Sequence, residues 1–174
     1  MAGPENVKLV ISDVDGVLTD GTVVYTEGGE QIMTFCVADG AGSAYLARAG
    51  IPVALMSGRN CRPVVHRARE MGIREVRMGL ESKTETLDEI LKEFGVGSDE
   101  VCYIGDDFKD VPAMRRVGFP VAVADARPEV KKVAAWVTEA RGGRGALREV
   151  AERILRAQGK WADVVRRYEL PDQP

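Results

Sequence analysis

Two aspartates lie one residue apart directly after the first apolar run of the chain. Residues 9–21 read LVISDVDGVLTDG, so the run leads straight into Asp13, and Asp15 is followed by Gly16. This join places two carboxylates at the carboxyl end of a predicted buried strand, where open α/β sheets bind their ligands. Carboxylates held there on a tight turn suit divalent metal binding and nucleophilic attack on phosphorus.

Two further predicted strands also end in polar side chains, and a lysine begins a predicted helix between them. The carboxyl ends of parallel strands lie along one edge of a sheet, so residues far apart in sequence can meet in one crevice. Several carboxylates together repel one another unless a cation lies between them, and an oxygen-only ligand set favours magnesium over zinc. These residues are Ser57 and Arg59 after strand 51–56, Lys83 at the start of helix 83–94, and Asp106, Asp107 and Asp110 after strand 101–104.

The elements that must position these side chains alternate between strand and helix. Short β-branched runs are typical of buried strands, and apolar residues at helical spacing separate them. This alternation predicts an α/β fold with a doubly wound parallel sheet and right-handed crossovers. The expected strands are 7–12, 51–56, 75–78, 101–104, 119–123 and 135–137, and the expected helices are 41–49, 62–71, 83–94, 111–117, 128–134 and 144–158.

A β-hairpin is predicted between the first strand and the first helix. Two β-prone runs, 22–25 and 31–35, flank a turn that contains Gly28 and Gly29, which is a hairpin signal. A hairpin at about 21–37, planted directly after the acidic loop, would hang over that loop as a flap.

Composition limits the class of protein. The chain has 174 residues and a net charge of −3, with acidic and basic residues interspersed, which predicts one domain over residues 1–174 and no nucleic-acid partner. We expect no membrane partner and a cytoplasmic location, because no apolar run approaches the ~20 residues of a membrane helix and residues 1–6 show no signal pattern. The polar C-terminal tail, about 161–174, ends in PDQP.

The polar clusters resemble the four motifs of the haloacid dehalogenase superfamily of phosphohydrolases. Residues 13–19, DVDGVLT, look like the first motif, Ser57 the second, Lys83 the third, and residues 105–110, GDDFKD, the fourth. One DxDG sequence arises easily by chance, whereas four motifs in order on suitable elements are a specific signal.

This resemblance implies a role for each residue. Asp13 attacks phosphorus and forms an aspartyl-phosphate, and Asp15 protonates the departing sugar oxygen and later activates water. Magnesium is held by the Asp13 carboxylate, the Asp15 backbone carbonyl and Asp106. Ser57 and Lys83 bind the transferring phosphoryl group, and Asp107 and Asp110 tune the surroundings of the metal.

A closer resemblance, over about residues 7–160, is to cap-less phosphatases of this superfamily that act on sugar acids. It implies hydrolysis of 3-deoxy-D-manno-octulosonate 8-phosphate in lipopolysaccharide synthesis. It also implies a homotetramer in which hairpins from neighbouring subunits help to close the site. Candidate contacts to this small-molecule sugar phosphate are Arg59, Arg67, Asp39, Gly40 and Arg144, of which Arg67 is equally consistent with an exposed helix position and Arg144 with a helix cap.

Other readings of the sequence stay open. Similar enzymes usually have a basic residue before Asp39, whereas this chain has Ala38. A 9-phosphorylated nonulosonate is therefore a rival substrate. Outside enzymes of this kind, a phosphoryl-accepting signalling module would also combine an acceptor aspartate, acidic metal ligands and a lysine on such a sheet. A catalytically silent scaffold is a third reading.

Overall fold

A computed structural model describes residues 2–169 of the chain. Six strands form one parallel sheet in the order β5-β4-β1-β6-β7-β8, and two short strands form a separate hairpin. The strands are β1 (Leu9–Asp13), β2 (Val24–Tyr25), β3 (Gln31–Ile32), β4 (Val53–Ser57), β5 (Glu75–Met78), β6 (Val101–Gly105), β7 (Phe119–Ala122) and β8 (Trp136–Val137). The predicted doubly wound α/β fold is confirmed.

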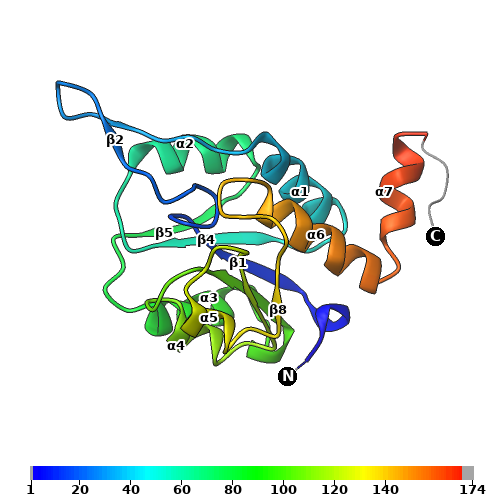
Figure 1. Cartoon of the computed structure of the whole chain (residues 1–174). Helices are drawn as coiled ribbons and strands as arrows, with labels where there is room; N and C mark the ends of the chain where they lie inside the picture. Colours follow the sequence, from blue (N-terminus) through cyan, green and yellow to red (C-terminus); the bar gives the residue numbers. More distant parts are fainter. Residues whose placement is uncertain (1, 170–174) are drawn as a thin grey trace.

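Helices cover both faces of the sheet (Figure 1). Helices α1, α2 and α6 lie on one face and α3, α4 and α5 on the other. The α-helices are α1 (Val37–Arg48), α2 (Arg62–Glu70), α3 (Lys83–Phe94), α4 (Val111–Met114), α5 (Pro128–Lys131), α6 (Ala146–Ala157) and α7 (Trp161–Arg167), and two 3-10 turns cover Pro4–Asn6 and Ser98–Glu100. None of the helices described is long and apolar enough to cross a membrane.

Strand β1 lies at the centre of the sheet and is buried along its whole length. It pairs with β4 on one side, where Asp13 is opposite Met56, and with β6 on the other, where Ser12 is opposite Ile104. The polar residues that follow β1, β4 and β6 therefore emerge side by side at one edge. This is the arrangement predicted from the alternation of strands and helices.

Helix α1 begins at Val37, four residues before the predicted start. Two glycines, Gly40 and Gly42, lie in the first half of this helix although glycine is a poor helix former. In the structure a Cβ on Gly42 would lie 2.7 Å from the Cα of Arg148 in α6. Glycine is needed at this position because the backbones of α1 and α6 approach closely. This tertiary contact outweighs the low helix propensity of glycine.

The C-terminal region contains a helix that the sequence interpretation missed. Helix α7 occupies the first half of the predicted polar tail, and Trp161 packs edge-on against Tyr45 of α1 with ring centroids 6.2 Å apart. The guanidinium of Arg156 lies 4.8 Å from the Trp161 ring. Aromatic and cation–π contacts thus stabilise a segment whose composition reads as polar. The PDQP end lies outside the described residues.

Candidate active site

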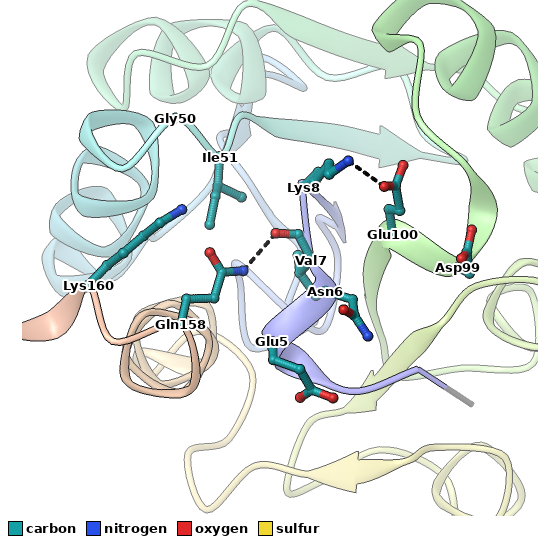
Figure 2. A pocket seen from close by; sticks show the side chains of 10 residues that line it. All are labelled: Glu5, Asn6, Val7, Lys8, Gly50, Ile51, Asp99, Glu100, Gln158 and Lys160. Carbon is teal, nitrogen blue, oxygen red and sulfur yellow. Dashed lines mark hydrogen bonds and ion pairs between the residues drawn. The ribbon is translucent and has the colours of Figure 1, made fainter.

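Charged side chains also gather at the amino edge of the sheet, just before β1, β4 and β6 (Figure 2). A cavity of about 410 Å³ lies there. Lys8 forms an ion pair of 2.5 Å with Glu100, and the Gln158 amide donates to the Val7 carbonyl at 2.8 Å. The Lys8 side chain is 65% exposed. These charges are paired and close to water, so they need no ligand.

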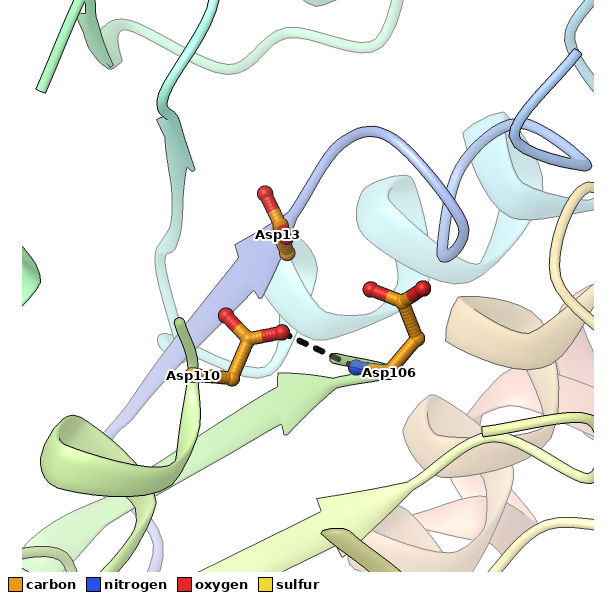
Figure 3. Close-up of side chains that lie close together, drawn as sticks. All are labelled: Asp13, Asp106 and Asp110. Atoms are coloured by element: carbon orange, nitrogen blue, oxygen red, sulfur yellow. Dashed lines mark hydrogen bonds between the residues drawn. The ribbon is translucent and has the colours of Figure 1, made fainter. Parts of the chain in front are cut away.

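At the carboxyl edge, three aspartates converge in front of β1 and β6 (Figure 3). One carboxylate oxygen from each of Asp13, Asp106 and Asp110 lies within 4.8 Å of the other two. Asp13 ends β1, Asp106 directly follows β6, and Asp110 begins the turn into α4. The structure thus brings Asp13 to the same edge as Asp106 and Asp110, which follow it by more than 90 positions in the chain, as the predicted parallel sheet requires.

Lys83 is the only cation bonded to this cluster among the described residues. Its ammonium contacts Asp13 Oδ2 at 2.8 Å and Asp110 Oδ1 at 2.6 Å. Asp13 Oδ1 also accepts a hydrogen bond of 2.7 Å from the backbone N–H of Val14. Asp13 and Lys83 are 8% and 7% exposed, and Asp110 is fully buried. The side chain of Asp13 is therefore fixed at both oxygens.

The cluster carries more negative charge than Lys83 balances. Burial, followed by the charge of Asp110, raises the pKa of Asp13 to about 7 although Lys83 acts in the opposite direction. Burial and the neighbouring carboxylates Asp110 and Asp13 likewise raise the pKa of Asp106 to about 7. For Lys83, burial lowers the pKa, but the two carboxylates outweigh it and the net shift is upward. A divalent cation would relieve this repulsion.

The donor set fits magnesium. Asp106 Oδ1 is buried and has no hydrogen-bond partner, so it can serve as a hard oxygen ligand. Gly16 makes the space, since a Cβ there would lie 2.1 Å from Asp106 Oδ2. Asp110 is less suited, because its oxygens accept bonds from Lys83, from the Tyr103 hydroxyl and from two backbone N–H groups.

Asp15, Ser57 and Arg59 form a second group beside the cluster. The Arg59 guanidinium pairs with Asp15 Oδ1 at 3.0 Å, and the Ser57 hydroxyl lies 3.4 Å from Asp15 Oδ2. The Ser57 oxygen also accepts the backbone N–H of Arg59 at 3.1 Å. The Asp15 side chain is 27% exposed, more than that of Asp13. The two aspartates of DVD thus have different partners and different access to water.

The remaining predicted residues are spread over neighbouring elements. Asp39 is buried in the first turn of α1, and its Oδ1 accepts the N–H of Arg148 at the start of α6. Burial raises the pKa of Asp39 to about 6. Arg67 donates to the Cys36 carbonyl at 2.8 Å, and Gly40 lies beside it. Arg144 is exposed in the loop before α6, and Asp107 is exposed after β6.

Sequence reasoning did not single out Tyr103, which is buried in β6 beneath the aspartates. Its hydroxyl donates to Asp110 Oδ1 at 2.9 Å. The available signal was a tyrosine in the otherwise apolar strand VCYIG, since a buried hydroxyl needs a partner.

The fold and the site define a phosphohydrolase of the haloacid dehalogenase type, and residues 79–147 match the haloacid dehalogenase-like hydrolase family. The 3-deoxy-D-manno-octulosonate 8-phosphate phosphatase of Haemophilus influenzae is 45% identical over 157 residues, which are 90% of this chain and 87% of that protein. That of Escherichia coli K12 is 41% identical over 92% of this chain and 85% of that protein. The chain belongs to the family of these 3-deoxy-D-manno-octulosonate 8-phosphate phosphatases.

Solved structures agree with this membership. The enzyme of this name from Moraxella catarrhalis, in complex with magnesium ion, phosphate ion and KDO, is 35% identical and superposes with a TM-score of 0.93 over 95% of each chain. That from Yersinia pestis is 41% identical, with a TM-score of 0.90 over 91% of this chain and 86% of that one.

Proposed function

We propose that the protein is a magnesium-dependent phosphomonoesterase that hydrolyses 3-deoxy-D-manno-octulosonate 8-phosphate. The observation that carries this proposal is the buried Asp13–Lys83 pair beside the unpartnered Asp106 oxygen, in a chain that belongs to a family of such phosphatases. A phosphoryl-accepting signalling module or a silent scaffold has no comparable support from the relatives.

In the first step, Asp13 is the nucleophile. A carboxylate oxygen of Asp13 forms a bond to phosphorus as the ester P–O bond breaks, which gives an aspartyl-phosphate and a sugar alkoxide. Asp15 delivers a proton to that alkoxide as it leaves. The two contacts that fix Asp13, to Lys83 and to the Val14 N–H, hold its carboxylate in one orientation and reduce the entropy lost on reaction.

In the second step, Asp15 acts as a general base. Water attacks phosphorus, Asp15 accepts its proton, and the bond between phosphorus and the Asp13 oxygen breaks to release phosphate. Ser57 and Lys83 bind the phosphoryl oxygens in both steps, and Lys83 is 7% exposed, so its charge acts where water screens it little. Asp110 orients Lys83, and Asp107 adds negative charge near the metal site.

Asp13, Asp106 and the backbone carbonyl of Asp15 would hold the magnesium ion. When bound, magnesium neutralises phosphoryl oxygens and the carboxylates that crowd this edge. The unpartnered Asp106 oxygen and the raised pKa values of Asp13 and Asp106 support this assignment.

Substrate choice would depend on arginines around the rim. Arg59 lies directly beside Asp15, so a sugar carboxylate bound there with two hydrogen bonds would be next to the proton carrier. Arg67, together with Asp39 and Gly40 of α1, and the exposed Arg144 are further candidate contacts. Ala38, in place of a basic residue, is the reason to test nine-carbon sugar acids as well.

The decisive experiment measures kcat/KM with magnesium for the octulosonate 8-phosphate, a 9-phosphorylated nonulosonate and p-nitrophenyl phosphate. We expect the octulosonate to exceed p-nitrophenyl phosphate by at least about 100-fold, because only the sugar acid engages the rim arginines. Equal values for these two esters, with rapid cleavage of the nonulosonate, would transfer the assignment to the nine-carbon substrate.

Asp15→Asn separates an enzyme from a phosphoryl-accepting module. Turnover should be lost while magnesium binding, followed by calorimetry, is kept, because the expected ligand at this position is the backbone carbonyl. Unchanged turnover would contradict the role of Asp15 as proton carrier. Stable phosphorylation of the wild-type protein without release of phosphate would favour the signalling function.

We also propose a homotetramer whose hairpins help to close neighbouring sites. The hairpin and the residues around it expose apolar side chains, with Tyr25 60% and Ile32 49% exposed. Light scattering should give four chains for the wild type, and Tyr25→Ser with Ile32→Ser should give smaller species. A monomeric wild type contradicts this proposal.

A cytoplasmic location is proposed as well, where the three free cysteines stay reduced.

A further inference from the structure

Tyr103 lies in the middle of the central strand β6 and is fully buried. A phenol carries an O–H donor into an interior whose neighbouring strand residues are apolar. Leaving such a donor unpaired in the interior would destabilise the fold, so a phenylalanine would pack there more simply unless the hydroxyl has a partner and a role.

The hydroxyl donates to a single carboxylate oxygen that Lys83 also contacts. Asp110 Oδ1 lies 2.9 Å from the Tyr103 oxygen and 2.6 Å from the Lys83 nitrogen. The same ammonium lies 2.8 Å from Asp13 Oδ2. A continuous chain of contacts therefore leads from Tyr103 through Asp110 and Lys83 to the carboxylate proposed to attack phosphorus.

The other oxygen of Asp110 is fixed by the backbone. Asp110 Oδ2 accepts the N–H groups of Asp106 at 3.0 Å and Asp107 at 3.2 Å. Each oxygen of Asp110 thus has two donors, which is about the full capacity of a carboxylate. With Tyr103 in place, the carboxylate cannot rotate toward Lys83 without losing a bond. It also offers no spare lone pair to a metal.

We infer that Tyr103 is a positioning residue for the phosphatase reaction: its hydroxyl fixes Asp110, and Asp110 in turn holds the Lys83 ammonium against Asp13. This inference rests on the proposed function. Without the hydroxyl, Asp110 Oδ1 has Lys83 as its one remaining partner. The Asp110 carboxylate can then rotate, and the ammonium that it holds shifts out of its position against Asp13.

Tyr103→Phe tests the inference, because it removes one oxygen and keeps the ring. With the octulosonate 8-phosphate, kcat should fall about 10-fold while KM changes less than about twofold, since a small misplacement of a catalytic group acts on the reaction step. Cys102→Ala is the matched control. Cys102 is the preceding residue of β6, is fully buried and lies outside the polar network, so its truncation loosens the strand and should leave kcat within about twofold.

A double-mutant cycle with Lys83→Ala tests whether Tyr103 acts by positioning Lys83 or only by keeping the enzyme folded. If Tyr103 acts through Lys83, Tyr103→Phe changes kcat by less than about twofold in the Lys83→Ala background. A 10-fold fall in both backgrounds overturns the inference, as does a Tyr103→Phe enzyme that matches the wild type. If the Phe variant does not fold, Tyr103→Met carries the same cycle. A wild type without phosphatase activity on any of the three esters contradicts the proposed function itself, and the inference then falls with it.

Discussion

The two edges of the sheet gather charged residues at the ends of the same three strands, yet they differ in how those charges are balanced. At the amino edge, Lys8 pairs with Glu100 and both side chains reach water. At the carboxyl edge three aspartates converge, and within residues 2–169 the one cation bonded to them is Lys83, which contacts Asp13 and Asp110 and leaves Asp106 without a bonded cation. Asp110 is fully buried. The first arrangement is complete without a ligand. The second is not.

This difference shows that the presence of a cavity is a weaker guide to the active site than the balance of buried charge. The amino-edge cavity of about 410 Å³ lies where no buried polar side-chain atom lacks a partner among the residues described. The carboxyl edge contains the unpartnered Asp106 oxygen and two carboxyl groups whose pKa values burial raises to about 7. A bound cation would relieve the repulsion among these carboxylates and would in turn attract the negatively charged phosphate ester.

The largest effect is expected from Asp13→Asn. An amide is nearly isosteric with the carboxylate but does not attack phosphorus, so kcat should fall by at least about 10⁴-fold. Steady-state rates with the octulosonate 8-phosphate, together with trapping of phosphorylated protein, measure this loss. Asp99→Asn at the amino edge is the matched control and should keep full activity, since Asp99 is an exposed carboxylate. Residual turnover above about one hundredth of wild type would identify another nucleophile.

Asp106→Asn is expected to have the next largest effect, because it removes a charge from the proposed metal site. The magnesium concentration for half-maximal activity should rise at least about 100-fold. Titration of activity with magnesium measures this shift. An unchanged magnesium requirement would exclude Asp106 as a ligand. A metal site at Asp106 would then no longer explain why the charges at the carboxyl edge are unbalanced.

The same variant should change how stability depends on pH in the metal-free protein. An unfolded aspartate has a pKa of about 3.9, whereas that of folded Asp106 is about 7. Between these values the folded state holds a proton that the unfolded state has released, so the free energy of unfolding falls as pH rises from about 4 to about 7. Asp106→Asn removes this contribution and flattens the curve, although Asp13 keeps part of the slope. Thermal unfolding of the wild type and of Asp106→Asn from pH 5 to 8, in a chelator and again with magnesium, measures how the stability of each protein depends on pH.

Gly16→Ala should have a smaller effect on the same site. Gly16 has φ of +84°, and a Cβ would overlap the Asp106 carboxylate, with contacts of 2.1 and 2.4 Å. Asp106 must move, so we expect a rise of about 10-fold in the magnesium requirement and a lower kcat. Gly50→Ala at the amino edge is the matched control, because φ there is +78° and no atom lies within 4 Å of its Cβ. Both variants carry the strain of a positive φ, and only Gly16→Ala should change catalysis.

The carboxyl edge was predictable from sequence because its signals are local. Apolar runs that end in Asp13, Ser57 and Asp106 predict strands, and parallel strands place their ends together. The start of α1 and the existence of α7 were not predictable in this way. Gly42 is helical because α6 packs against it, and Trp161 is held by Tyr45, far away in the sequence. Likewise, the sequence did not reveal that Tyr103 has Asp110 as its partner.

The smallest effect is expected at the amino edge itself, from Lys8→Ala combined with Glu100→Ala. This double variant removes both partners of an ion pair whose side chains reach water. No buried charge is left without a partner, so the loss should be small. We expect kcat and KM within about twofold of wild type and a Tm shift below about 2 °C, measured by steady-state kinetics and thermal unfolding. Lys83→Ala, in contrast, leaves Asp13 and Asp110 buried without their shared cation. If the amino-edge variant lost as much activity as Lys83→Ala, exposure of a charge pair to water would not explain the difference between the two edges. The cavity beside Lys8 would then have a role in catalysis.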